Sequence, residues 1–296
     1  MIVRAPGKAF LSGEYAMLHG APAVIVAVNR HARAQLETGA APGLSPFLAE
    51  LLRRRPAPAG QYPVVDSSAL HDASGAKLGL GGSAAVTVAA AGALFAAEGQ
   101  PLDAVTVRAE LLRLCVAAHR AAQGGRGSGG DVAASVHGGV VRVALHDGDV
   151  EVTPAALPAG FTLKLFRLGR PVSTPEMLRT VEALAAAEGV RHAALMEALV
   201  SAAEDFGGDP IGALRAQLRR LTALGVAAGV EIVPRAGWAL AAAAEAVGGA
   251  AKPSGAGGGD LAVALVPSAR VADFLRFAAA SPLDLEIDEA GVTLEH

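Results

Sequence analysis

Short apolar runs alternate with longer segments of helical spacing along this chain of 296 residues. The short runs are bounded by glycine, proline or polar turn residues, which predicts strands. The predicted strands lie at residues 2–5, 22–28, 64–65, 140–145, 161–168 and 261–266. Apolar residues that recur every three to four positions predict helices. The predicted helices lie at residues 84–97, 103–122, 175–188, 191–206, 210–228, 235–247 and 268–280.

Three connecting segments complete this pattern. Residues 39–62 contain several glycines and prolines and predict an irregular excursion with one short helix. Asp147-Gly148 predicts a hairpin turn after the fourth strand. A pair of strands is expected after the last helix. Because the elements follow no strict strand-helix-strand rhythm, the fold class is predicted to be α+β.

The length suits two domains that share an interface. A stretch rich in proline and alanine at residues 154–160 predicts the boundary, with domains at residues 1–157 and 158–293. Residues 294–296, Leu-Glu-His, resemble the start of a purification tag and are set aside.

Composition narrows the possible partners and the compartment. Hydrophobic residues make up 52% of the chain and the net charge is −3, without the basic stripe of a nucleic-acid binder. The longest apolar stretch, residues 86–97, is too short to cross a bilayer. The N-terminal residues lead directly into a glycine-containing motif, so no signal peptide is expected. Cys115 is the only cysteine, which fits a reducing cytoplasm. We therefore expect a cytoplasmic protein with neither a nucleic-acid nor a membrane partner.

Lysine is scarce in this chain, and its placement is informative. Four of the 25 basic residues are lysines, which leaves 21 arginines. Lys8, Lys77 and Lys252 each lie beside a glycine-rich segment. Lysine acts as a compact point charge that suits phosphate, so these positions indicate phosphate chemistry, although chance placement of a few residues explains them too.

Two segments in the N-terminal third contain candidate site residues. Ala5–Gly20 includes a lysine, a glutamate and a tyrosine between two predicted strands, and a structural turn explains it equally well. Lys77–Ala85 has glycines at the start of the predicted helix 84–97. Glycines let a ligand approach the backbone, and the free amides of a helix N-terminus favour an anion. A phosphate site is therefore predicted there, with Ser83 as a hydroxyl ligand for Mg²⁺; a tight turn is the alternative.

Two further glycine-rich segments lie later in the chain. Residues 125–130 match G-x-G-x-x-G, but a helix rather than a strand precedes them, which excludes the dinucleotide motif. A flexible loop that brings Ser128 and Asp131 to one place remains. Lys252–Asp260 offers a run of amides that could bind an anion, with a linker as the alternative. No Walker A motif or Cys/His cluster occurs, and the histidines are scattered.

Together these segments resemble the signature motifs of the GHMP kinase superfamily, in order along nearly the whole chain. Lys77–Ala85 is similar to the G-L-G-S-S-A phosphate loop, with Gly82 in place of the first serine. Lys252–Asp260 is similar to the C-terminal glycine motif.

Several more specific sequence motifs resemble those of the phosphomevalonate kinase family within this superfamily. Tyr15 follows Gly-Glu where mevalonate kinases usually have histidine, and residues 119–133 match H-x-x-A-Q-G-x-x-G-S-G-x-D-V-A. Residues 169–174, Gly-Arg-Pro-Val-Ser-Thr, and Lys252–Asp260 are similar to the same family. Two departures are that Leu261 replaces a common cysteine, and that the helix before Asp131 lacks the glutamate that mevalonate kinases use for Mg²⁺.

The resemblance implies a ribosomal-protein-S5-like N-terminal domain and a ferredoxin-like C-terminal α/β domain. It implies ATP and Mg²⁺ as cofactors and phosphomevalonate as the small-molecule substrate. Lys8 and Asp131 would be catalytic, and Ser83 would contact the metal. The implied ATP-binding residues are Lys77, Gly79, Leu80, Gly81, Gly82, Ser83 and Ala84. The implied substrate-binding residues are Glu14, Tyr15, Gln123, Ser128, Lys252, Ser254, Gly255 and Ala256.

Three alternatives stay open at this point. One is mevalonate kinase or another GHMP kinase; another is a non-catalytic ligand-binding regulator on the same fold. The third is an RNA-binding module, which the acidic charge disfavours. The oligomeric state is expected to be a monomer or a homodimer.

Overall fold

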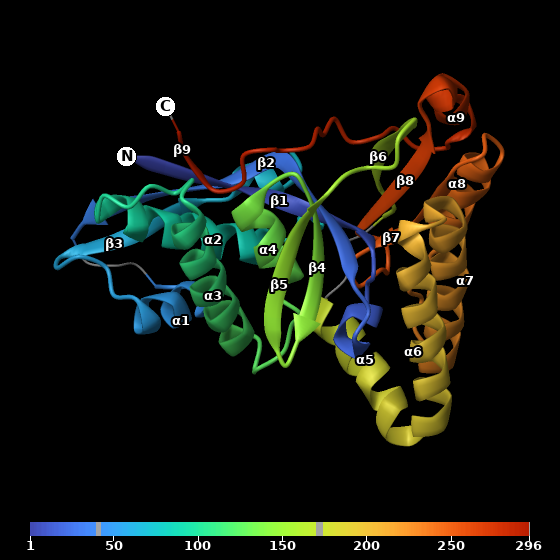
Figure 1. The fold of residues 1–296 in the computed structure, drawn as a ribbon, viewed down its shortest axis with the longest axis horizontal. Helices are drawn as coiled ribbons and strands as arrows, with labels where there is room; N and C mark the ends of the chain where they lie inside the picture. Colours follow the sequence, from blue (N-terminus) through green and yellow to red (C-terminus); the bar gives the residue numbers. More distant parts are fainter. Residues whose placement is uncertain (40–42, 170–173, 296) are drawn as a thin grey trace.

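Two antiparallel sheets, each with helices packed against it, form the structure (Figure 1). The computed structural model describes residues 1–39, 43–169 and 174–295. The larger sheet has the order β5-β4-β2-β1-β9, with β3 paired to β2 off this path, and the smaller sheet has the order β6-β8-β7. Every strand pairing between these strands is antiparallel, which confirms the predicted α+β class.

The elements have the following bounds in the described residues. The strands are β1 (Ile2–Ser12), β2 (Ala23–Thr38), β3 (Gln61–Asp66), β4 (Val140–His146), β5 (Asp149–Ala155), β6 (Phe161–Arg167), β7 (Ala250–Ser254), β8 (Leu261–Pro267) and β9 (Thr293–Glu295). The helices are α1 (Pro46–Arg54), α2 (Gly82–Ala97), α3 (Val105–Ala122), α4 (Gly130–His137), α5 (Thr174–Ala187), α6 (Gly189–Glu204), α7 (Pro210–Ala228), α8 (Arg235–Glu245) and α9 (Val271–Phe277). The predicted helices and the hairpin turn are confirmed, and α1 is the short helix expected within residues 39–62.

Strand β1 is much longer than predicted, and this corrects the expectation of a turn after residue 5. It pairs with β2 as far as Ser12, with register shifts between Pro6 and Gly7 and between Phe10 and Ser12. Such irregularities let a strand accommodate residues that would otherwise interrupt the ladder. Lys8 therefore lies on a strand in the middle of the molecule rather than in a surface turn.

Two elements near the site were missed from the sequence. Helix α4 spans only eight residues and begins at a glycine, so its pattern is too short to detect. Strand β7 includes Lys252 and Pro253, which argue against a strand. Because β7 is an edge strand of the smaller sheet, a proline without an amide hydrogen is tolerated there.

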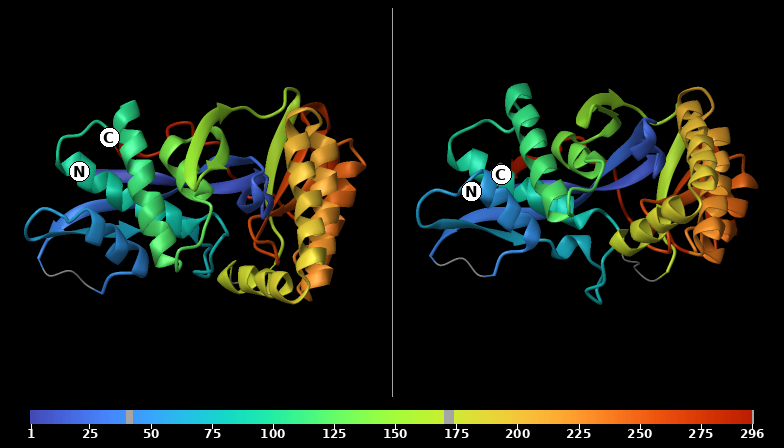
Figure 2. Two further views of the ribbon diagram at one scale, coloured as in Figure 1. Left: turned by 60° about the horizontal axis from the view of Figure 1, so that its bottom comes forward. Right: turned by 90° about the horizontal axis from the view of Figure 1, so that it is seen from below.

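The expected pair of strands after the last helix is also corrected. Within the described residues this part of the chain contributes one strand, β9, which pairs with the start of β1. Residues 283–288 instead contact the sheets through isolated backbone hydrogen bonds. One of these runs from the amide of Leu283 to the carbonyl of Leu165 at 2.8 Å. The two ends of the described chain thus lie together, as Figures 1 and 2 show.

Both faces of the smaller sheet are buried. On β8, Leu261, Val263 and Leu265 face the core formed by α2 and the larger sheet, whereas Ala262 and Ala264 face a second core. This alternation follows from the two-residue period of a strand. Helices α6, α7 and α8 lie on the side of the smaller sheet that faces this second core (Figures 1 and 2).

The two halves of the chain also exchange core residues. Tyr15, Ala16 and Ala21 from the N-terminal half pack in the second core. The domain boundary at 157/158 stays a prediction, as does the tag origin of residues 294–296. Of these, Leu294 and Glu295 lie in β9, and His296 lies outside the described residues. No helix among the described residues has the length and apolar content that a bilayer crossing requires.

The close contact between Gly138 and Gly291 provides a test of this packing. A Cβ at Gly138 would lie 2.3 Å from the amide nitrogen of Gly291, and its φ is +74°. Gly148 has a φ of +88°, and an added Cβ would meet nothing within 4 Å. We expect Gly148→Ala to lower the free energy of unfolding by about 1 kcal/mol and Gly138→Ala by about 3 kcal/mol or more, measured by urea unfolding. Equal losses would contradict the close contact.

Candidate active site

Lys8 and Asp131 form an ion pair where three elements meet. The Nζ of Lys8, on β1, lies 3.5 Å from Oδ2 of Asp131, which is in the first turn of α4. The side chain of Lys8 is 6% exposed and that of Asp131 is 29% exposed. The amide of Lys8 donates to the carbonyl of Leu80 at 2.9 Å, so the same strand also holds the predicted phosphate loop.

The phosphate loop is packed directly against this ion pair. A Cβ at Gly81 would lie 2.6 Å from Cε of Lys8 and 3.4 Å from Oδ2 of Asp131. Gly79 and Gly81 also have positive φ values of +76° and +69°, so both positions need glycine. Helix α2 begins at Gly82, and no side chain in the described part of the protein caps it. Its first amides therefore favour an anion beside Lys8.

Ser83, in the first turn of α2, is paired with a histidine that sequence reasoning did not single out. Its Oγ lies 3.0 Å from Nε2 of His119 on α3. Burial lowers the pKa of His119, and nearby Lys8 acts in the same direction while Asp131 opposes it. The phenyl ring of Phe47 on α1 stacks against the imidazole with centroids 5.0 Å apart. The only sequence signal for this residue was its place at the start of the 119–133 motif.

The C-terminal glycine segment reaches β1 and the turn that follows it. The hydroxyl of Ser254 accepts a hydrogen bond from the amide of Phe10 at 2.8 Å. The hydroxyl of Tyr15 donates to the carbonyl of Ala256 at 2.7 Å. Tyr15 has a φ of +60°, which is unusual for a residue other than glycine and occurs often at functional sites. Burial raises the pKa of Tyr15, with a smaller contribution from Glu14.

The same segment also contacts the phosphate loop, so the four predicted segments converge. A Cβ at Gly79 would lie 3.0 Å from Cβ of Asp260. The third segment joins through Asp131. The converging segments therefore extend from Lys8 to Asp260 along the chain.

Lys252 is buried and paired with Glu14. Its side chain has no exposed surface, and its Nζ bonds Oε1 of Glu14 at 2.5 Å and the carbonyl of Pro253 at 3.0 Å. Burial lowers the pKa of Lys252, whereas Glu14 opposes this effect. In this structure the ammonium group of Lys252 contacts Glu14 and the backbone, and its substrate-binding role stays a prediction. Oε1 of Glu14 also accepts from the amide of Gly255 at 3.3 Å, and its buried Oε2 has no hydrogen-bond partner among the residues that the structure describes.

The remaining predicted residues lie at the edges of this arrangement. Gln123 directly follows α3, and the hydroxyl of Ser128 accepts from the amide of Gly130 at 3.2 Å. Arg120, which was also missed, holds this loop by donating to the carbonyls of Gly127 and Ser128. Lys77 precedes the phosphate loop and forms a backbone bridge with His71. Within the segment 169–174, residues 170–173 lie outside the described residues.

The oxygen donors present fit Mg²⁺. Among the described residues, no group of three or more His, Cys, Asp or Glu side chains gathers around one point. Mg²⁺ usually takes one or two protein oxygens together with phosphate oxygens and water. The hydroxyl of Ser83 and the carboxylate of Asp131 supply that kind of donor, and both lie close to the phosphate loop.

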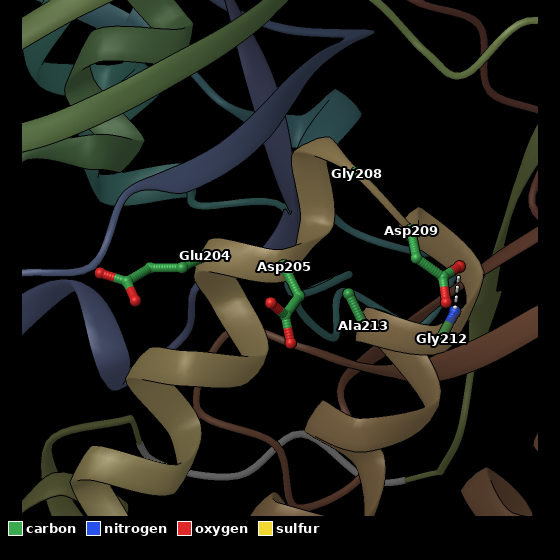
Figure 3. Close-up of a pocket in the computed structure, with 6 residues that line it drawn as sticks. All are labelled: Glu204, Asp205, Gly208, Asp209, Gly212 and Ala213. Atoms are coloured by element: carbon green, nitrogen blue, oxygen red, sulfur yellow. Dashed lines mark hydrogen bonds between the residues drawn. The ribbon is translucent and has the colours of Figure 1, made fainter.

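A surface hollow at the junction of α6 and α7 is unrelated to these residues (Figure 3). It is lined by Glu204, Asp205, Gly208, Asp209, Gly212 and Ala213. The three carboxylates point in different directions, and Asp209 caps α7 by accepting from the amide of Gly212 at 2.9 Å. The hollow therefore lacks a convergent set of binding groups.

Comparisons with known proteins identify the class. A family model described as "GHMP kinases N terminal domain" matches residues 63–139. Phosphomevalonate kinase from Streptomyces sp. (strain CL190) is 32% identical over 90% of this chain and 90% of its own. Mevalonate kinase from Aeropyrum pernix is 28% identical over 62% of each chain. The structure of Streptococcus pneumoniae phosphomevalonate kinase in complex with phosphomevalonate and AMPPNP has a TM-score of 0.77 at 18% identity, covering 97% of this chain and 99% of that one.

The chain therefore belongs to the GHMP kinase superfamily and is an ATP-dependent small-molecule kinase with the GHMP kinase fold. Its similarity over nine-tenths of both chains places it, within that superfamily, with the phosphomevalonate kinases. The resemblance predicted from the motifs is thereby confirmed, and the mevalonate kinase similarity is the weaker of the two.

The Glu14–Lys252 pair provides a second test. Removing one partner of a buried pair leaves an uncompensated charge, so Lys252→Met should lower the free energy of unfolding by about 3–5 kcal/mol. The double variant Glu14→Gln/Lys252→Met should be more stable than Lys252→Met alone, because no charge is left unpaired. Lys164→Met, on β6 of the same sheet, serves as the control and should change stability by less than about 1 kcal/mol. A double variant less stable than the single one would argue against the pairing.

Proposed function

We propose that this protein transfers the γ-phosphoryl group of ATP to the phosphate of (R)-5-phosphomevalonate, giving 5-diphosphomevalonate. The observation that carries the proposal is the contact of Lys8 and Asp131 with the glycine loop at the start of α2. Phosphoryl transfer depends on alignment and charge stabilisation, and this arrangement offers a cation, an acid and free amides in one place.

The donor side would be formed by the glycine loop and α2. Amides of residues 79–84 would hold the ATP phosphates, with Ser83 and Asp131 beside the bound Mg²⁺. Mg²⁺ neutralises phosphate charge when it is bound. Lys8 would lie between the donor and the acceptor and stabilise the charge of the transferred group.

The acceptor side would be formed by the C-terminal glycine segment and the loop before α4. Ser128, Ser254, Gly255 and Ala256 would hold the acceptor phosphate. The hydroxyl of Ser254 accepts from the amide of Phe10, which leaves its own hydrogen available for a phosphate oxygen. The contacts from Tyr15 and Glu14 would keep this segment in place.

Asp131 would orient Lys8 and the metal rather than remove a proton. A phosphate monoester has a second pKa of about 6 and is already largely ionised at neutral pH. Such an acceptor needs little help from a base. The 3.5 Å contact between Asp131 and Lys8 fits an orienting role.

The setting we propose is the cytoplasm, where a lone buried cysteine such as Cys115 stays reduced. The protein would act there as a monomer or a homodimer. Mevalonate kinase is the second candidate function, because of the similarity to the Aeropyrum pernix enzyme. A non-catalytic regulator on the same fold is disfavoured by the intact Lys8–Asp131 pair.

A coupled ADP-release assay with each acid tests the proposed substrate. We expect turnover with phosphomevalonate and a kcat/KM for mevalonate that is at least about 100-fold lower, because the phosphate-binding groups would be left unpaired. A preference for mevalonate would identify the second candidate instead. ATP binding without turnover of either acid would support the regulator.

Substitutions at the ion pair test the two roles. Lys8→Met should lower kcat by about 10²–10³-fold, since it removes charge stabilisation of the transferred group. Asp131→Asn keeps the shape and one oxygen, so its loss should be at least about tenfold smaller. The measurements are kcat for both variants and the pH profiles of the wild-type and Asp131→Asn enzymes. Equal and near-total losses, with a wild-type profile that shows one required base, would contradict the orienting role.

A further inference from the structure

The imidazole of His119 lies behind the phosphate loop and bonds the one side chain of that loop that has a hydroxyl. Its Nε2 is 3.0 Å from Oγ of Ser83, and only 6% of the residue is exposed. We propose that His119 is a positioning residue, which fixes the hydroxyl of Ser83 so that its oxygen faces Mg²⁺ and the ATP phosphates. This inference rests on the proposed function only in its use of ATP and Mg²⁺ at the glycine loop.

The hydroxyl of Ser83 needs an external partner to hold one orientation. A serine in the first turn of a helix can rotate among three staggered positions and can bond nearby backbone groups instead of a ligand. In the imidazole tautomer with its hydrogen on Nδ1, Nε2 accepts the hydroxyl hydrogen of Ser83. The lone pairs of the serine oxygen are then left for a cation, which is the orientation that a metal ligand requires.

The imidazole is itself held from the side away from the loop. The ring of Phe47 stacks on it, with an angle of 29° between the planes. Phe47 belongs to α1. Arg55, the residue directly after this helix, pairs with Glu98 and Glu110, and its Cζ lies 3.8 Å from the ring centroid of Phe95. Phe47 on α1 thus restrains the imidazole of His119 in the orientation that contacts Ser83.

A merely structural contact between α2 and α3 is the competing explanation, and the chain offers a matched control for it. Cys115 lies one helical turn before His119 on α3 and is fully buried against α2. Its Sγ lies 3.9 Å from the carbonyl of Thr87 on α2. Cys115→Ala removes packing at this interface without touching Ser83. Loss of packing alone should therefore affect Cys115→Ala and His119→Leu in similar ways.

The experiment measures binding of AMPPNP by calorimetry, with and without Mg²⁺ and with no acceptor present. We expect His119→Leu to weaken binding with Mg²⁺ by about tenfold or more, as loss of a partner behind a metal ligand does, and to change binding without Mg²⁺ by less than about twofold. His119→Gln, which keeps an acceptor of similar reach, should restore most of the affinity. Cys115→Ala should leave both affinities unchanged.

A double-variant cycle with Ser83→Ala isolates the contact. If His119 acts through the serine hydroxyl, adding His119→Leu to Ser83→Ala should change the affinity for Mg²⁺ and AMPPNP by less than about twofold. Additive losses, equal losses with and without Mg²⁺, or the same loss in Cys115→Ala would overturn the proposal. If His119→Leu does not fold, as shown by circular dichroism, His119→Asn takes its place, because its shorter side chain does not reach Ser83. Since no acceptor is present, these results do not depend on whether phosphomevalonate is the substrate.

Discussion

The arrangement of the site depends on the position of one ammonium group, the Nζ of Lys8, inside the molecule. Its side chain is 6% exposed, and burying an unpaired charge costs several kcal/mol. Asp131 at 3.5 Å and the ring face of Phe10 at 5.2 Å from its centroid provide partial compensation. A further anion would complete it, and the uncapped start of α2 adjoins the same position. The fold therefore keeps a partly compensated cation beside the first amides of α2.

Strand β1 is the element that makes this geometry possible. Its amides, and that of the residue just after it, bond to three separate parts of the molecule. Lys8 donates to the phosphate loop, Phe10 to Ser254 in the C-terminal glycine segment, and Gly13 to the side chain of Gln217 on α7. The glycine loop before α2 and the C-terminal glycine segment are consequently both positioned against one strand. Phosphoryl transfer gains most of its rate from such alignment.

The sequence predicted the parts of the fold that have a clear period, and the segments with dense glycine motifs. Helices such as α2 and α3 and the convergence of Lys8 with Asp131 belong to this group. It did not predict that β1 runs through Pro6 and Gly7, because strand pairing with β2 overrides the local turn signal. His119 and the partner of Lys252 were missed for another reason: a hydrogen bond between residues far apart in the chain leaves no mark in local spacing.

Lys8 and Lys252 differ in how completely their acidic partners are buried. The pair of Lys252 with Glu14 is short and almost completely buried, so neither charge can exchange its partner without a large desolvation cost. The pair of Lys8 with Asp131 is longer, and the carboxylate is 29% exposed. A partly exposed carboxylate can exchange its contact for water at a lower desolvation cost than a fully buried one. The same residue type, paired with an acid in both places, is therefore fully enclosed at position 252 and lies beside a partly exposed carboxylate at position 8.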